Sequence, residues 1–163
     1  QFPDLQFVTN MVTAAKAAQF NAIKQQIAPD LVINEFTGQA RQVLLAADAT
    51  FITSGTATLE TALFRVPQVV VYKTSGISYA IAKRLIRVPF ISLVNLIADR
   101  KVVAELIQDD YNVENLSQEL NLILSNILHK AEILDGYTEI KEKLGTNSAS
   151  ETTARMICSN LEI

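Results

Sequence analysis

Segments rich in β-branched residues alternate with segments of helical spacing along most of the chain, and this alternation constrains the fold more than any other feature. The clearest strand candidate is Val69–Tyr72, because nearly continuous β-branched sequence is typical of a strand buried on both faces of a parallel sheet. Strands that alternate with helices imply right-handed crossovers, so we predict an open, doubly wound parallel α/β sheet. The predicted strands are Leu5–Thr9, Leu31–Ile33, Ala49–Thr53, Val69–Tyr72 and Phe90–Leu93, and the predicted helices are Thr13–Ile27, Arg41–Ala47, Ala57–Phe64 and Ile77–Ile86.

Beyond Asp99 the strand pattern fades and helical spacing continues to the end of the chain. A length of 163 residues is about that of one domain, and no linker is long or polar enough to divide it. We therefore predict a single α/β domain over residues 1–163 with a helical part from about 99 to 163. The predicted helices of this part are Lys101–Ile107, Val113–Leu128, Glu132–Leu144 and a last one that starts at Ser148, where Glu151 completes a capping box.

Composition excludes several classes of protein. A net charge of -3 offers no basic surface for a phosphate backbone, so we expect no nucleic-acid partner. Cys158 and His129 are each the only residue of their type, so we expect no disulfide framework, no bound metal and no cofactor, and a reducing cytoplasm fits best. No apolar run approaches the roughly 18 residues that a spanning helix needs. Because the chain begins with Gln1 rather than Met, we expect it to be part of a longer protein.

The most informative site candidate is Ser54-Gly55-Thr56, where a predicted strand ends and a helix begins. In an open α/β sheet, ligands bind outside the carboxyl ends of the strands. Small residues let a ligand approach the backbone, and free amides at a helix start, together with two hydroxyl groups, suit an anionic diphosphate. The alternative is that Ser54 or Thr56 is only a helix cap and Gly55 only a turn residue.

Glu60 follows Thr56 by about one helical turn. A carboxylate at this position can accept two hydrogen bonds from a ribose diol. The alternative is an ordinary solvated glutamate in a helix.

Two further strand ends carry polar candidates. Tyr72 and Lys73 follow the Val69–Val71 run, and Lys73 either neutralises a phosphate or is a surface lysine. Asn95 follows the predicted strand Phe90–Leu93, and its amide could orient a sugar hydroxyl or a phosphate oxygen. The alternative for Asn95 is that it begins the next helix.

The predicted helix Ile77–Ile86 combines apolar and basic residues. One hypothesis is peripheral contact with acyl chains and anionic lipid. The alternative, which we favour, is a core-facing helix with a solvated basic side. The residues concerned are Ile77, Ile81, Leu85 and Ile86 on the apolar side and Lys83, Arg84 and Arg87 on the basic side.

The order and spacing of five segments resemble the C-terminal half of the lipid-A-disaccharide synthases, which are glycosyltransferases of the GT-B fold. The resemblance runs from about Asp4 to the end of the chain and implies a Rossmann-like, donor-nucleotide-binding domain. The segments are Ser54–Glu60, Pro67–Lys73, Ala82–Leu85, Ile91–Leu96 and Glu105–Gln108.

This resemblance implies an inverting enzyme of lipid A biosynthesis without a metal or cofactor. Such an enzyme transfers diacylglucosamine from UDP-2,3-diacylglucosamine to 2,3-diacylglucosamine 1-phosphate and releases UDP. It implies that Ser54, Gly55 and Thr56 face the diphosphate, Glu60 the ribose, and Asn95 the donor phosphates or sugar. We expect a cytoplasmic protein, and a peripheral place at the inner face of the inner membrane is the further hypothesis.

Several departures from the family pattern bear on activity. We expect two parts of the family's enzymes to precede this chain. They are the Pro-Gly-Ser-Arg segment and the half that binds the lipid acceptor and carries the catalytic carboxylate. We therefore expect a domain that is truncated on its N-terminal side and inactive alone. Lys73 stands where the family has arginine, and Val94 where it has proline. The alternatives are another GT-B enzyme that uses UDP-N-acetylglucosamine, such as an epimerase or a peptidoglycan glycosyltransferase, and a non-enzymatic Rossmann-like module.

Overall fold

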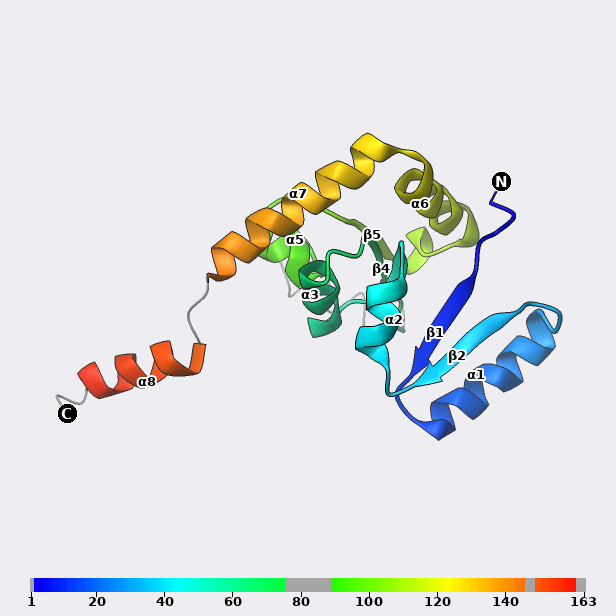
Figure 1. The fold of residues 1–163 in the computed structure, drawn as a ribbon, viewed down its shortest axis with the longest axis horizontal. Coiled ribbons are helices and arrows are strands. Elements are labelled where there is room, and N and C mark those ends of the chain that lie inside the picture. Colours follow the sequence, from blue (N-terminus) through cyan, green and yellow to red (C-terminus); the bar gives the residue numbers. More distant parts are fainter. Residues whose placement is uncertain (1, 76–88, 146–148, 161–163) are drawn as a thin grey trace.

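The strands form two parallel sheets (Figure 1) in the computed structural model, which describes residues 2–75, 89–145 and 149–160. In the first sheet, β1 (Phe7–Met11) pairs with β2 (Ile33–Thr37). The second sheet has the order β3 (Thr50–Thr53), β4 (Gln68–Tyr72) and β5 (Ala104–Ile107). Both pairings of the second sheet are parallel, and helices alternate with the strands, which confirms the predicted α/β fold.

Three helices connect the first four strands, close to where the sequence predicts them. The helix α1 (Ala14–Ile27) begins at Thr13, whose hydroxyl accepts a hydrogen bond from the Lys16 amide at 3.3 Å. This is the usual cap that satisfies a free amide of the first turn. The next two connections are α2 (Ala40–Ala46) and α3 (Thr56–Leu63).

The predicted strand Phe90–Leu93 is wrong, because this segment leads into the helix α5 (Leu93–Ala98). The Ser92 hydroxyl caps that helix by accepting a hydrogen bond from the Asn95 amide at 3.2 Å. The run of apolar residues resembles a strand, but the buried side chains of Val94 and Ala98 are four residues apart, which is helical spacing.

The predicted helix Lys101–Ile107 is also wrong, since residues 104–107 form β5. Its side chains alternate between buried and half-buried, and Val70 of β4 lies opposite Glu105. Alanine, glutamate and leucine favour helices in isolation, but pairing with a buried central strand outweighs that weak preference. The helical end of the chain therefore begins later than predicted, at Val113.

Three helices complete the described part of the chain. They are α6 (Val113–Ser125), α7 (Ile127–Leu144) and α8 (Ala149–Asn160). The break between α6 and α7 falls at Asn126, which caps α7 through a 3.0 Å bond from the His129 amide, so α7 starts earlier than predicted. None of the described helices is long and apolar enough to cross a membrane. The predicted helix Ile77–Ile86, its basic residues and Ser148 lie outside the described residues.

The main core lies between the second sheet and the C-terminal helices. Val70 of β4 is fully buried, as are Val94 of α5 and Ile140 of α7. The phenol of Tyr137 donates a 3.1 Å hydrogen bond to the Val66 carbonyl and accepts one from the side-chain amide of Gln68. Burial raises the pKa of this phenol well above its ordinary value. The β3–β5 sheet is thus fixed to α7 by apolar and polar contacts.

Gly136 lets α7 approach the segment before β5 that carries Val102, because a Cβ atom at Gly136 would overlap the Val102 side chain. We expect Gly136→Ala to lower the free energy of unfolding by about 1–3 kcal/mol, since overpacking outweighs the gain of about 1 kcal/mol in helix propensity. Urea unfolding of the full-length protein measures this change. The exposed Asp135→Ala on the same helix is the control, and equal stabilities of the two variants would refute the close packing.

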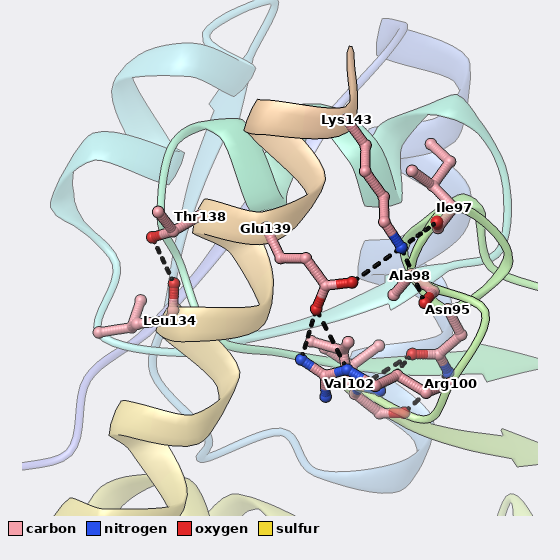
Figure 2. A network of polar contacts seen from close by, with 10 residues as sticks. Asn95, Ile97, Ala98, Arg100, Val102, Leu134, Thr138, Glu139 and Lys143 are labelled. Carbon is pink, nitrogen blue, oxygen red and sulfur yellow. Dashed lines mark hydrogen bonds and ion pairs between the residues drawn. The ribbon is translucent and has the colours of Figure 1, made fainter. Parts of the chain in front are cut away.

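Glu139 links two cations on the side of α7 that faces the end of α5 (Figure 2). Its carboxylate accepts hydrogen bonds from Arg100 at 2.8 and 3.2 Å and lies 2.8 Å from the Lys143 ammonium. Lys143 also donates to the carbonyls of Ile97 and Ala98 at 3.2 and 3.1 Å. These contacts of Glu139 and Lys143 therefore hold the end of α5 against α7.

The hydrogen bonds from Lys143 and then from Arg100 lower the pKa of Glu139 below its ordinary value of 4.5. A depressed pKa stabilises the fold above the ordinary value, and this stabilisation is lost as the pH falls through the pKa of the folded state. Glu139→Gln should therefore lower the urea midpoint at pH 7, and the difference from the wild type should shrink and vanish as the pH falls well below 4.5. Glu142→Gln on the same helix is the control, and a Glu139→Gln difference that does not change with pH would contradict the role of the ion pairs.

Candidate functional site

The carboxyl ends of β3, β4 and β5 lie at one edge of the second sheet. The three strands are parallel neighbours, with Thr53 opposite Val71 and Tyr72 opposite Ile107. Residues that follow them, including Ser54 and Lys73, therefore emerge on the same side. This is the edge at which open α/β sheets bind ligands.

Ser54 connects the end of β3 to the segment before α5. Its amide donates to the Val71 carbonyl at 3.3 Å, and its hydroxyl donates to the Ile91 carbonyl at 2.7 Å. The hydroxyl oxygen still has lone pairs, but its proton is used inside the protein. Ser54 thus holds the strand end in place beside the start of α3.

The start of α3 has no side-chain cap. Gly55 is the capping residue, and its carbonyl accepts from the Thr58 hydroxyl at 2.7 Å and from the Thr58 amide at 3.1 Å. Thr56 and Ala57 are exposed. The alternative that Ser54 or Thr56 caps this helix is wrong, and the amides of Thr56 and Ala57 have no partner among the described residues, so they are suited to bind an anion.

The conformation of Gly55 is restricted to glycine. Its φ of 152° and ψ of -167° lie in a region that residues with a Cβ atom rarely adopt. A Cβ atom there would meet nothing within 4 Å, so the requirement for glycine comes from the backbone and not from crowding.

Glu60 lies one turn further along α3 and faces α2. Its Oε1 atom is 3.5 Å from Nε of Arg41, and the two side chains are 44% and 77% exposed. An ion pair this exposed is weak, so the carboxylate is available to a ligand. Arg41 was not recognised from the sequence, because nothing in the spacing relates it to a residue 19 positions away.

Tyr72 and Lys73 leave the end of β4 with exposed side chains. The backbone after them is fixed by Gln108: the Thr74 amide donates to the Gln108 side chain at 2.8 Å, and the same side-chain amide donates back to the Thr74 carbonyl at 3.1 Å. Gln108 therefore positions the β4 exit, a role that the sequence does not indicate.

Asn95 lies in α5 and not at a strand exit, so the strand-based interpretation of it is wrong. Its side chain is fully buried and makes four hydrogen bonds inside the protein. The side-chain oxygen accepts from the amides of Val102 and Val103 at 2.8 and 3.0 Å, and the nitrogen donates to the Val103 carbonyl and to Glu105 at 3.0 and 2.8 Å. This accounts for the full bonding capacity of the amide.

Glu105 is the acceptor that organises this region, and its place in the sequence does not mark it as a site residue. One carboxylate oxygen accepts from the Ile91 amide at 2.9 Å, and the other accepts from the amide and hydroxyl of Ser92 at 3.0 and 2.7 Å. Asn95 donates to it as well. The Ile91 carbonyl accepts a hydrogen bond from the Ser54 hydroxyl, so Glu105 indirectly supports the β3–α3 junction by holding Ile91 in place.

The remaining chemical residues lie outside this edge. His129 is 3.9 Å from Glu132 on α7, and Cys158 is exposed on α8. Within the described ranges no three His, Cys, Asp or Glu side chains are grouped so that they could hold a metal ion.

Comparison with known proteins gives one consistent result. A family model described as lipid-A-disaccharide synthetase matches residues 1–157. The chain is similar to the lipid-A-disaccharide synthases of Actinobacillus pleuropneumoniae serotype 5b (strain L20), with 42% identity over 161 residues, and of Haemophilus influenzae (strain 86-028NP), with 38% over 161 residues. The identity to the lipid-A-disaccharide synthase of Pasteurella multocida (strain Pm70) is 37% over 166 residues.

These similarities extend over nearly the whole chain but only part of each relative. They cover 96% of this chain for the first two relatives and 99% for the third. The chain spans 41% of the length of the first two relatives and 42% of the third.

Proposed function

The chain belongs to the lipid-A-disaccharide synthetase family, and on that premise we propose that it forms the UDP-sugar donor site of a GT-B glycosyltransferase. The observation that carries the proposal is the uncapped start of α3 at the carboxyl edge of a parallel sheet. The Rossmann-like arrangement of strands and helices fits such a donor-binding half.

The proposed donor contacts follow from this geometry. The amides at Gly55 and Thr56, with the hydroxyl of Thr56, bind the diphosphate, which the helix dipole favours, and Ser54 positions them through its hydrogen bond to the Ile91 carbonyl. Glu60 binds the ribose hydroxyls, and Lys73 adds positive charge beside Tyr72 at the β4 exit.

We assign Asn95 a positioning role in the same site instead of a direct donor contact. Its side chain is buried, and its polar atoms are bonded to the backbone of Val102 and Val103 and to Glu105. Through Glu105 and Ile91 it helps to fix Ser54.

In the proposed reaction, the 6-hydroxyl of 2,3-diacylglucosamine 1-phosphate attacks the anomeric carbon of UDP-2,3-diacylglucosamine. The bond to the diphosphate breaks, UDP takes the electron pair, and the new β-1,6 bond has inverted configuration. The start of α3 stabilises the charge that develops on the departing diphosphate. The base that takes the hydroxyl proton lies in the acceptor-binding half, outside these 163 residues. The lipid substrates favour a location at the cytoplasmic face of the inner membrane.

Product analysis tests this function. The full-length protein should convert UDP-2,3-diacylglucosamine and the acylated acceptor to disaccharide and UDP, and unacylated UDP-N-acetylglucosamine should be a poor donor. Preference for the unacylated donor would favour an epimerase or a peptidoglycan glycosyltransferase. Absence of UDP binding would favour a non-enzymatic module.

The 163-residue chain alone should form no disaccharide, because it lacks the proposed base and acceptor site. Incubation of the purified chain with both substrates checks this expectation. Disaccharide above the level of a protein-free control would refute the division of roles between the two halves.

A further inference from the structure

Glu60 of α3 pairs with Arg41 of α2, and Figure 1 shows the two helices side by side. Nε of Arg41 donates to Oε1 of Glu60 at 3.5 Å. The other carboxylate oxygen, Oε2, has no hydrogen-bond partner among the residues that the structure describes. One oxygen of Glu60 is therefore held by Arg41, while the other is open to a ligand.

The helix α3 places Glu60 on the same face as the residue that begins it. Thr56, Glu60 and Leu63 follow one another at helical spacing, and all three are accessible to solvent. The side chains of Thr58 and Thr61 face the core and are fully buried. The carboxylate thus lies one helical turn, about 6 Å along the axis, from the start of α3 where the diphosphate is proposed to bind.

The helix α2 holds Arg41 near a fixed point of the backbone. The amide of Gln39, the residue before α2, donates to the Asn10 side chain at the end of β1 at 2.9 Å. Arg41 is the second residue of α2. The start of a helix carries partial positive charge, which disfavours a cation there. The helix therefore does not stabilise the charge of Arg41, whereas Glu60 does.

The ion pair should become stronger when a ligand covers it. In the free protein it is weak, because the side chains of Arg41 and Glu60 are 77% and 44% exposed. A nucleotide bound at Glu60 would remove water from the carboxylate, which costs free energy unless a cation compensates the charge. The guanidinium is such a cation, and its attraction to the carboxylate increases as water leaves. Arg41 should therefore matter most in the complex.

The pair also limits the directions that the carboxylate can take. An unpaired, exposed glutamate side chain has many rotamers and loses this freedom on binding. With Oε1 held by Arg41, Oε2 of Glu60 stays directed away from the guanidinium. A ribose presents two neighbouring hydroxyls that one carboxylate can accept together, whereas a 2′-deoxyribose lacks one of them. A carboxylate fixed in this way distinguishes the two sugars.

We propose that Arg41 is a positioning residue that makes the donor site selective for ribonucleoside diphosphates over 2′-deoxyribonucleoside diphosphates. It acts through Glu60, because it orients the carboxylate and compensates its charge when the nucleotide is bound. The inference rests on the proposed function, since it requires that Glu60 bind the ribose.

Calorimetric titration of the full-length protein with UDP and with 2′-deoxy-UDP tests the proposal. The wild type should bind UDP about tenfold more tightly, the usual contribution of one charge-assisted hydrogen bond. Glu60→Ala should remove this preference, and Arg41→Ala should reduce it to about threefold or less. The matched control is Arg65→Ala, which should keep the preference of the wild type, because Arg65 donates to Thr138 of α7 at 3.0 Å.

A double variant separates positioning from direct contact with the nucleotide. If Arg41 acts through Glu60, adding Arg41→Ala to Glu60→Ala should change the affinity for UDP by less than about twofold at physiological ionic strength. A larger loss of affinity in the double variant would overturn the positioning role, because Arg41 would then contact the nucleotide itself.

The results for the single variants separate this inference from the proposed function. A preference for UDP that Glu60→Ala removes and Arg41→Ala retains would overturn the inference and leave the proposed ribose contact standing. Equal binding of UDP and 2′-deoxy-UDP by the wild type, or binding of neither, would overturn both.

Discussion

Glu105→Ala should destabilise the full-length protein by about 3 kcal/mol or more, because each buried donor left without a partner costs about 1–3 kcal/mol. The change removes the acceptor of two backbone amides, one hydroxyl and one side-chain amide, which come from Ile91, Ser92 and Asn95. Glu105→Gln keeps one acceptor oxygen and should have a smaller effect. Urea unfolding at pH 7 measures both.

The exposed Glu142→Ala is the matched control for this loss, and it should change stability by less than about 0.5 kcal/mol. The Glu105 network also extends to the proposed donor site, because the Ile91 carbonyl accepts a hydrogen bond from the Ser54 hydroxyl. A Glu105→Ala protein as stable as the Glu142→Ala protein would show that the network does not hold the β5–α5 region.

Gly55→Ala should lower kcat/KM of the full-length enzyme by about 100-fold, the usual size of the effect when one donor to a developing negative charge is lost. The residue needs a φ of 152°, and a side chain there is strained by about 1–3 kcal/mol, so the start of α3 must shift. The amides proposed to face the diphosphate then no longer point at it. Steady-state kinetics with UDP-2,3-diacylglucosamine measures the loss.

Gly145→Ala is the control for backbone strain alone. Gly145 has a φ of 67° and follows α7, and a Cβ atom added to it would meet nothing within 4 Å. We expect this variant to keep the activity of the wild type. Equal kcat/KM for the two alanine variants would contradict the role of Gly55.

Most regular elements of the N-terminal part were predictable because they have a strong local pattern, but the strand predicted at Leu31–Ile33 is misplaced, since β2 is formed by Ile33–Thr37. Val69–Val71 is continuously β-branched, and the helix after Thr13 begins with a good capping residue and carries repeated apolar positions. Such signals depend on residues close in sequence, so no tertiary information is needed.

The errors lie where short segments depend on distant partners. The strand Ala104–Ile107 consists partly of helix-forming residues and is a strand because β4 pairs with it. The segment before α5 resembles a strand until Ser92 caps the helix. A four-residue element has too little sequence for propensity to decide.

The candidate site was predictable in part for the same reason. Ser54-Gly55-Thr56 has a local signature, a strand followed by small residues and a helix. Glu105 and Gln108 have none, since their roles depend on contacts with Ile91 and Thr74 that the fold creates. Asn95 was expected at an accessible strand end, but it is buried because the backbone of Val102 and Val103 needs its amide.

Mapping UDP on the isotope-labelled full-length protein by NMR tests most directly whether the carboxyl edge of β3–β5 binds the UDP portion of the donor. Titration with UDP should shift the amide signals of Gly55, Thr56, Glu60 and Lys73 and leave those at the end of α7, near Gly145, unchanged. Shifts confined to another region, such as the cavity beside Arg100 and His129, would contradict this location of the donor site.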